Sequence, residues 1–448
     1  MFLKNVPGLV TTMVRHTMLL RFHICIYVKY TFSKYIYMKL TKDSQKLIKY
    51  FEHDTLPPLK PTVSAKKLII QLYNDIVRGI KYINKMKMEQ GKHFCKLSME
   101  RITDVKQVPI PSTFSLTAFP ENIISHIQQH SLTALTYHFN LFNRTIQIIF
   151  IIEHNYNNVT KMVQLYNNYV NYMLVWLYIV DQYSSNKCAK QLKIFLYHTN
   201  LLKQLPKSNN TVLNENNVNT AFTKTCPHNS EIVVFRKEEW FKVFIHETFH
   251  NFALDFSDMS LDACTTTILS LFPVKSDVNL FEAYTEFWAR IMNALFCSFI
   301  QLKDKHNVAS FLSYAEHFIN LERTYSFFQM EKVLKFMGLT YADLYKKDNT
   351  KRHALYKEDT NVLSYYVLTS ILMNNCYDFM LWCNMHNNKV LNFTKTVHNL
   401  TEFCNYIKKK YKTSAMLDNV NCAKKQVEDV KPKTYIAINL RMTMLDLE

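Results

Sequence analysis

The stretch EIVVFRKEEWFKVFIHETFHNFALDFS, residues 231–257, decides the fold. Its first residues, 231–236, are rich in β-branched and aromatic side chains, which is typical of a strand. Residues 238–254 carry apolar side chains at helical spacing, which predicts a helix packed against a core. His246 and His250 stand four positions apart on that helix, so both imidazole rings lie on one face and can bind one ion.

The His-Glu-x-x-His pattern suits a zinc ion, which neutral imidazole nitrogens bind well. Glu247 directly follows the first histidine, and this spacing aims its carboxylate at water beside the metal. We therefore predict that Glu247 is a general base, which takes a proton from water and later passes it to the leaving amine of a peptide bond.

Two histidines need a third protein ligand, and the residues just after His250 do not supply it. Phe256 stands where a metzincin would have its third histidine, so that arrangement is excluded. Asp255 lies about 140° around the helix from the ligand face, which favours a helix cap over a metal ligand.

Better candidates lie on a second predicted helix, 278–302. Glu282 and Glu286 stand four positions apart on one face, and the small side chain of Ala283 allows another helix to approach closely. We predict that Glu282 completes the metal site and that Glu286 accepts the free ring N–H of a ligand histidine. The reversed assignment of the two glutamates stays open.

A His-Glu-x-x-His helix followed by a Glu-x-x-x-Glu helix resembles the pattern of the gluzincin metallopeptidases, the thermolysin-like and lethal-factor-like zincins. The resemblance covers residues 130–305, and the run 231–257 is also similar to uncharacterised zincin-like proteins of large DNA viruses. It implies an upper β/α lobe with the active-site helix, a helical lower lobe and one zinc ion per chain. It matches residue by residue at five functional positions, namely His246, Glu247, His250, Glu282 and Glu286.

The run Asn219-Thr220-Ala221-Phe222 resembles the edge strand with which such peptidases hold the main chain of their substrate. The resemblance therefore implies that Asn219 and Ala221 bind substrate.

The family also has a downstream tyrosine or histidine that stabilises the oxyanion. Tyr365, Tyr366 and His353 are the candidates in this chain, and no motif selects one of them. The chain departs from thermolysin-like members at Phe281, where those proteins have an asparagine.

Hydrophobic periodicity predicts an α+β fold, with a mixed sheet and backing helix followed by a mostly helical lobe. The resemblance implies that this fold is zincin-like, with an active-site helix beside the sheet. The predicted strands are 132–140, 145–152, 191–197, 218–223 and 231–236, with a buried backing helix at 159–183. The predicted regions are a leader or misassigned start (1–37), a helical lead-in (38–118), the upper β/α lobe (119–256), the helical lower lobe (257–411) and a weakly ordered basic tail (412–448). The lead-in is either a pro-segment over the cleft or a packing domain.

The charge of the chain limits its partners only loosely. Lys and Arg together number 54 against 36 Asp and Glu, which gives a net charge of +18. A basic surface attracts polyanions, but the lysines are spread and no RNA-recognition or zinc-finger pattern accompanies them, so nucleic-acid contact is predicted to be secondary. The four glycines form no phosphate-binding fingerprint, which excludes nucleotide binding by that route.

We predict a peptide or protein substrate for a zinc-dependent metallopeptidase. One alternative is a zincin fold that serves as a binding or virion-associated structural protein with little turnover. Another is a basic nucleic-acid-associated protein in which the histidine pattern is accidental.

The ten cysteines are scattered without Cys-x-x-Cys pairs, which indicates free, mostly buried thiols in a reducing compartment. Cys226 and His228 are an alternative metal pair, but no matching second pair exists. Charges interrupt residues 7–38, so neither a spanning helix nor a signal peptide is expected, while a surface anchor or a start at Met38 stays open. We predict an intracellular protein, in the host cytoplasm or virion if viral, that is not secreted.

Overall fold

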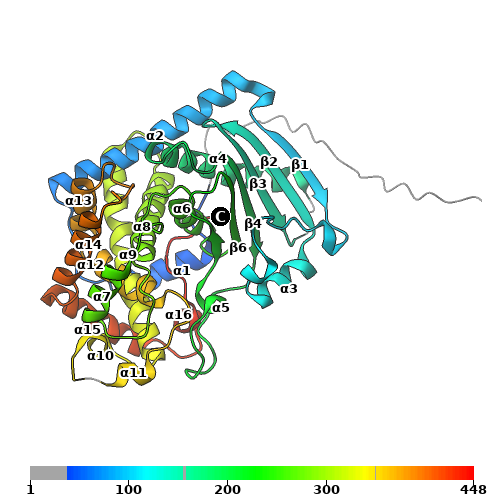
Figure 1. The fold of residues 1–448 in the computed structure, drawn as a ribbon. Helices are drawn as coiled ribbons and strands as arrows, with labels where there is room; N and C mark the ends of the chain where they lie inside the picture. Colours follow the sequence, from blue (N-terminus) through cyan, green and yellow to red (C-terminus); the bar gives the residue numbers. More distant parts are fainter. Residues whose placement is uncertain (1–37, 155–157, 349) are drawn as a thin grey trace, which may run out of the picture.

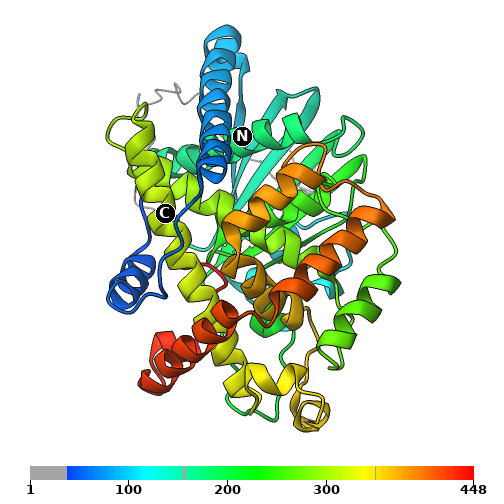
Figure 2. The ribbon, with the colours of Figure 1, turned by 90° about the vertical axis from the view of Figure 1, so that its left-hand side faces the viewer.

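The computed structural model describes residues 38–154, 158–348 and 350–448. Within them the chain forms an α+β fold, with a six-stranded mixed sheet on one side and a group of helices on the other (Figure 1). Figure 2 views the helical side, with the sheet behind it. The predicted leader, its possible surface anchor and the alternative start lie outside the described residues or at their margin. No helix among the described residues is both long enough and apolar enough to cross a membrane.

The strands lie side by side in the order β1-β2-β3-β4-β6-β5. β3, β4 and β6 run parallel, and the other neighbours are antiparallel. The strands predicted at 132–140 and 145–152 form a hairpin, since β2 and β3 pair around Phe142 and Asn143, which both have the positive φ angles of a tight hairpin turn. The strands are β1 (Lys96–Arg101), β2 (Thr133–Leu141), β3 (Arg144–Ile152), β4 (Gln191–Thr199), β5 (Ala221–Thr223) and β6 (Asn229–Arg236).

Most of the helices lie together on one side of the sheet (Figure 1). One continuous helix spans Val308–Phe336, and a π-helical turn, Leu363–Leu368, leads into the helix Thr369–Asn374. The helices are α1 (Lys42–Phe51), α2 (Val63–Gln90), α3 (Glu121–His130), α4 (Val159–Tyr183), α5 (Glu215–Val218), α6 (Trp240–Asn251), α7 (Asp262–Leu271), α8 (Leu280–Gln301), α9 (Val308–Phe336), α10 (Tyr341–Tyr345), α11 (Lys351–Leu355), α12 (Thr369–Asn374), α13 (Cys376–His386), α14 (Val397–Lys410), α15 (Ser414–Asp429) and α16 (Tyr435–Ile438).

The helix α4 has the predicted bounds and supports α6 from behind. The side chain of Asn158 accepts a hydrogen bond from the Lys161 N–H, which caps the first turn. The buried indole N–H of Trp176 donates to Thr248 Oγ1 at 2.7 Å. Because two polar groups buried without partners would be costly, this bond fixes the position of α6 against α4.

The helix α8 is buried on nearly all sides, and every residue from Glu282 to Phe299 is buried. It packs against α6 and α9 in the centre of the molecule (Figure 1). Three of its buried side chains are charged, namely Glu282, Glu286 and Arg290. Buried charges are retained only where partners or an ion compensate them, so the surroundings of these three side chains decide what this helix can do.

The predicted weakly ordered tail is wrong, because residues 412–448 are folded. In α15, Met416, Val420 and Ala423 are buried at helical spacing, while Lys424 and Lys425 are exposed on the other face. The lysines of this region therefore lie on the exposed face of a packed helix, and their number does not indicate disorder.

The last residues, 440–448, run back into the centre of the molecule (Figure 1). Leu440, Met444 and Leu445 are fully buried, and Leu447 pairs with Leu40 in an isolated antiparallel bridge. Two buried carboxylates, those of Glu239 and Glu322, accept hydrogen bonds from the backbone of this segment.

Candidate metal centre

The helix α6 begins two residues later than predicted, at Trp240. Glu239 adopts a left-handed conformation with φ of 61°, and its carboxylate accepts hydrogen bonds from the backbone N–H groups of Met442 and Thr443 at 2.7 and 2.6 Å. Glu238 instead binds Lys203 and Asn439. The two glutamates therefore precede the helix, although the sequence predicted its start at residue 238, and Glu239 holds the C-terminal segment.

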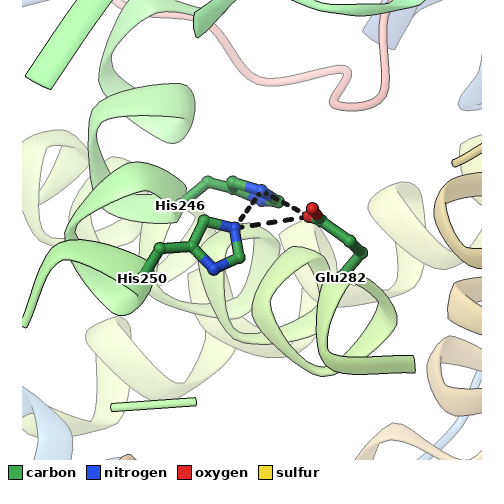
Figure 3. Close-up of side chains that lie close together, drawn as sticks. All are labelled: His246, His250 and Glu282. Atoms are coloured by element: carbon green, nitrogen blue, oxygen red, sulfur yellow. Dashed lines mark hydrogen bonds and ion pairs between the residues drawn. The ribbon is translucent and has the colours of Figure 1, made fainter. Parts of the chain in front are cut away.

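The structure brings three of the predicted ligand residues together in one buried group (Figure 3). His246 Nε2 lies 3.1 Å from Glu282 Oε2 and 3.1 Å from His250 Nε2. His250 Nε2 lies 3.3 Å from Glu282 Oε2. Three potential ligand atoms thus form a nearly equilateral triangle between α6 and α8.

This triangle fits a tetrahedrally coordinated ion. Ligand atoms at about 2.0–2.1 Å from a tetrahedral ion are roughly 3.3 Å apart, which agrees with the separations found here. The ring nitrogens in the triangle are both Nε2, and each Nδ1 is bound by another carboxylate. A buried group of His246, His250 and Glu282 could therefore hold a metal ion.

Glu286 lies where the sequence predicted it, beside the other nitrogen of His246. Its Oε2 is 3.1 Å from His246 Nδ1. Lys242 Nζ contacts both of its oxygens at 3.0 Å, and Arg290 Nε donates to Oε1 at 2.8 Å. Burial alone would raise the pKa of Glu286, but the charges of Lys242 and Arg290 hold this pKa well below its ordinary value. An ionised Glu286 accepts the Nδ1–H of His246 and so directs Nε2 towards the triangle.

Asp255 does the same for His250, a role that sequence reasoning missed. Its Oδ2 accepts the Nδ1–H of His250, and its Oδ1 accepts from the Ser257 hydroxyl at 2.9 Å. The side chain is fully buried. The position of Asp255 off the ligand face predicts a helix cap, but α6 ends at Asn251 and the chain turns through Ala253, which has a φ of 54°. That turn returns Asp255 to the histidine.

Glu247 is buried and lines a narrow cleft beside the triangle. Burial raises the pKa of its carboxyl. The lining comes from α6, α8, the stretch from the end of α5 to the start of β5, and three distant parts of the chain, namely Lys203, Val218, Asn219, Thr220, Ala221, Lys242, Val243, His246, Glu247, Glu286, Tyr365 and Met442.

Of the two predicted substrate-binding residues, Ala221 has the freer main chain. The Phe235 N–H donates to the Thr220 carbonyl at 2.9 Å, and bonded pairs alternate along antiparallel strands. The N–H and C=O of Ala221 therefore point away from β6, towards the open edge of the sheet. Asn219 is occupied, since its carbonyl accepts from Arg236 at 3.0 Å and its side chain accepts from Thr360 at 2.9 Å.

The three candidates for an oxyanion-stabilising residue separate clearly. Tyr365, in the π-helical turn, lines the cleft with its ring centroid 6.0 Å from that of His246. The neighbouring Tyr366 is not at the cleft, because its hydroxyl donates to the Leu440 carbonyl at 2.9 Å. His353 is exposed on α11 and is not among the cleft residues. The prediction for Tyr366 is therefore wrong, since consecutive residues of a helical turn point in different directions.

The prediction that all cysteines are free is wrong for four of them. Cys188 is bonded to Cys226, and Cys264 to Cys404. The partners lie 38 and 140 residues apart, so no local spacing could reveal them. The free cysteines of the described chain are Cys95, Cys297, Cys376, Cys383 and Cys422.

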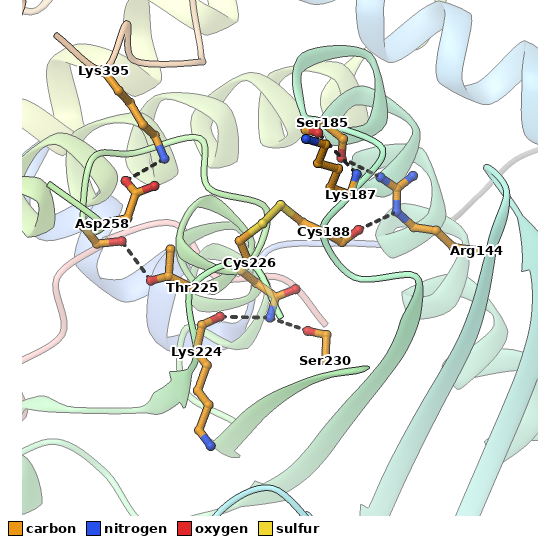
Figure 4. Close-up of a disulfide and its surroundings, with 12 residues drawn as sticks. Arg144, Ser185, Lys187, Cys188, Lys224, Thr225, Cys226, Ser230, Asp258 and Lys395 are labelled. Carbon is orange, nitrogen blue, oxygen red and sulfur yellow. Dashed lines mark hydrogen bonds and ion pairs between the residues drawn. A yellow bond between two sulfur atoms is a disulfide. The ribbon is translucent and has the colours of Figure 1, made fainter. Parts of the chain in front are cut away.

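The first disulfide ties the loop after β5 to the loop between α4 and β4 (Figure 4). The Cys226 N–H donates to the carbonyl of Asn251, the last residue of α6, at 3.1 Å. Asn251 Nδ2 in turn donates to Thr223 Oγ1 on β5 at 2.8 Å. The alternative metal pair of Cys226 and His228 is therefore wrong, because the sulfur of Cys226 is already bonded to Cys188.

No family model, curated protein or solved structure matches the chain.

Proposed function

We propose that the protein is a zinc-dependent metallopeptidase with a zincin-like arrangement of its site. The observation that carries the proposal is the buried triangle of His246, His250 and Glu282 atoms, with sides of 3.1–3.3 Å, beside Glu247 and an open sheet edge. Two imidazoles and one carboxylate are a donor set typical of catalytic zinc, which leaves a further position open.

A bound zinc ion would act as a Lewis acid that polarises the scissile carbonyl and makes water more acidic. Glu247 would take the proton of the attacking water and pass it to the leaving nitrogen. Tyr365 would donate its hydroxyl proton in a hydrogen bond to the developing oxyanion. Glu286 and Asp255 would keep the two histidines in the tautomer that presents Nε2.

The edge strand β5 supports a peptide as the substrate. An extended chain can add to the free edge of a sheet through its main chain, and Ala221 offers one N–H and one C=O on that edge. The order of edge strand, active helix and buried glutamate helix agrees with the zincin-like lobes expected from the sequence.

The proposal is tested with purified protein. We expect about one zinc ion per chain by elemental mass spectrometry, and cleavage of a peptide library that stops when a chelator is added. Glu247→Gln should retain zinc and lose at least about 100-fold in cleavage rate. Glu215→Gln, which changes an exposed glutamate of α5, is the matched control and should keep both.

Cleavage that persists in Glu247→Gln, or a wild-type chain without zinc, would contradict the proposal. The second candidate is a metal-binding protein of the same fold with little turnover. The burial of the site favours it, because His246, Glu247 and Glu282 are all less than 10% exposed. Zinc binding without cleavage of any library peptide would select this candidate.

A further inference from the structure

The segment 356–365 crosses from the metal site to the edge-strand side of the cleft. On the edge-strand side, the Asp359 N–H donates to the Leu213 carbonyl at 2.8 Å, and Thr360 Oγ1 donates to Asn219 Oδ1 at 2.9 Å. On the metal side, the next residue, Asn361, reaches α8. We call residues 356–365 the bridging segment.

The amide of Asn361 is bound on both of its sides by residues at the start of α8. Its Nδ2 lies 3.2 Å from Glu282 Oε1, and its Oδ1 lies 2.8 Å from Asn279 Nδ2. An ionised carboxylate only accepts hydrogen bonds, so Asn361 must present its NH₂ to Glu282. Its carbonyl oxygen then faces the NH₂ of Asn279, and the two contacts agree on one orientation of the amide.

The two oxygens of Glu282 consequently have different partners. Oε2 faces His246 Nε2 and His250 Nε2, whereas Oε1 faces Asn361. A carboxylate that is free to rotate can bind a metal through one or both oxygens. A hydrogen bond to Oε1 favours binding through Oε2 alone and keeps further positions on the ion open to water and substrate.

We propose that Asn361 is a positioning residue that holds Glu282 as a one-oxygen ligand of the metal. The proposal rests on the metal centre proposed above but not on peptidase activity. The backbone carbonyl of Asn361 also accepts the N–H of Tyr365 at 2.9 Å, so the same residue connects the ligand glutamate with the tyrosine at the cleft. Asn361 therefore helps to position both Glu282 and Tyr365.

The test compares cobalt-substituted and zinc-loaded protein for wild type, Asn361→Ala, Asn361→Asp and Thr360→Val. The visible absorption of bound Co²⁺ reports coordination number without any substrate. We expect both Asn361 variants to show weaker cobalt bands, as a higher coordination number gives, and a zinc dissociation constant about 10–100-fold higher than wild type. Asn361→Asp keeps the size of the side chain but replaces the donor by an acceptor, so packing alone cannot explain its effect.

Thr360→Val is the matched control, because it removes the bond to Asn219 from the same segment and leaves the contact with Glu282 in place. It should match wild type in cobalt spectrum and zinc affinity. An unchanged spectrum and affinity in either Asn361 variant would overturn the proposal. The proposal would also be overturned if Thr360→Val changed the cobalt spectrum and the zinc affinity as much as the Asn361 variants do, since the bridging segment as a whole would then be responsible. A wild-type chain that binds neither metal would overturn the metal centre itself.

Discussion

The two ligand histidines are oriented by different carboxylates from different parts of the chain. Glu286 on α8 binds His246, and Asp255, just after α6, binds His250. Each carboxylate accepts the Nδ1–H of its ring, which fixes the tautomer that directs Nε2 towards the candidate metal site. The surroundings of the two carboxylates differ, because Glu286 also pairs with two buried cations, Lys242 and Arg290.

For Asp255, we predict an effect on metal binding with little effect on folding. Asp255→Asn keeps the shape of the side chain and can still accept the Nδ1–H of His250, but it removes the negative charge that makes the ring a better ligand. The zinc dissociation constant should rise about 10-fold or more. Competition with a chromophoric chelator measures this, with Asp258→Asn, an exposed neighbour, as the control. Equal zinc affinity in Asp255→Asn and wild type would contradict the role given to Asp255.

For Glu286, we predict a loss of stability as well. Glu286→Gln leaves Lys242 and Arg290 buried without their common counter-charge, and breaking a buried ion pair costs about 3–5 kcal/mol. Urea unfolding of the metal-free protein should show this decrease in the free energy of unfolding. Because metal is absent in this measurement, a decrease cannot come from lost zinc. A variant as stable as wild type would mean that the two cations find other partners.

Among the elements, the edge strand β5 is the one most dependent on others. It has only three residues, Ala221–Thr223, and pairs on one side only, with β6. Asn251 at the end of α6 and the disulfide of Cys226 hold its end. The element that would bind substrate is thus positioned from the helix that carries the two histidines.

For the loop that follows β5, we predict that the Cys188–Cys226 disulfide stabilises the folded protein. Cys188→Ser should lower the free energy of unfolding by about 2–4 kcal/mol, because the bond restricts the unfolded chain. Urea unfolding measures the change, and Cys422→Ser, which alters a free cysteine, is the control. The prediction fails if the wild-type protein and Cys188→Ser unfold at the same urea concentration without reductant.

For the whole molecule, the C-terminal segment joins the sheet side to the helical side. Glu239 at the start of α6 and Glu322 in α9 both accept hydrogen bonds from its backbone, Glu322 from Met444 and Leu445 at 2.9 Å each. Trp240 Nε1 donates to the Leu447 carbonyl at 2.9 Å. The first and last described parts of the chain meet here, so the position of α6 depends on the completed fold.

This arrangement predicts a pH dependence of stability. Burial raises the pKa of Glu322 from 4.5 to about 7. The folded state therefore binds the proton more tightly than the unfolded state, and the stabilisation is complete below pH 4.5 and lost as the pH rises through about 7. We expect the free energy of unfolding to fall by up to about 3 kcal/mol over this range.

Urea unfolding at several pH values measures this slope. Glu322→Gln, which does not titrate, should flatten it, while Asp446, whose pKa burial raises to about 6, contributes a smaller slope in the same direction. A slope that is the same in Glu322→Gln and wild type would show that other groups cause the pH dependence.

Local pattern was enough to predict much of the fold and part of the site. The bounds of α4, the hairpin of β2 and β3, and the helices that carry His246, His250 and Glu282 follow from periodicity, because spacing alone decides which side chains share a face. The same rule, used at Asp255, gave the wrong role, since it applies only while the helix continues. It also could not separate Tyr365 from Tyr366.

What the sequence by itself determined is which residues can act together on one element: two histidines on one turn, two glutamates on another. Only the tertiary structure decided which elements meet. Asn361 at Glu282, Cys188 at Cys226 and the C-terminal segment beneath α6 are contacts between residues far apart in the chain. Such contacts arise from the packing of the whole core, which burial of apolar surface drives without regard to sequence distance, so no local pattern encodes them.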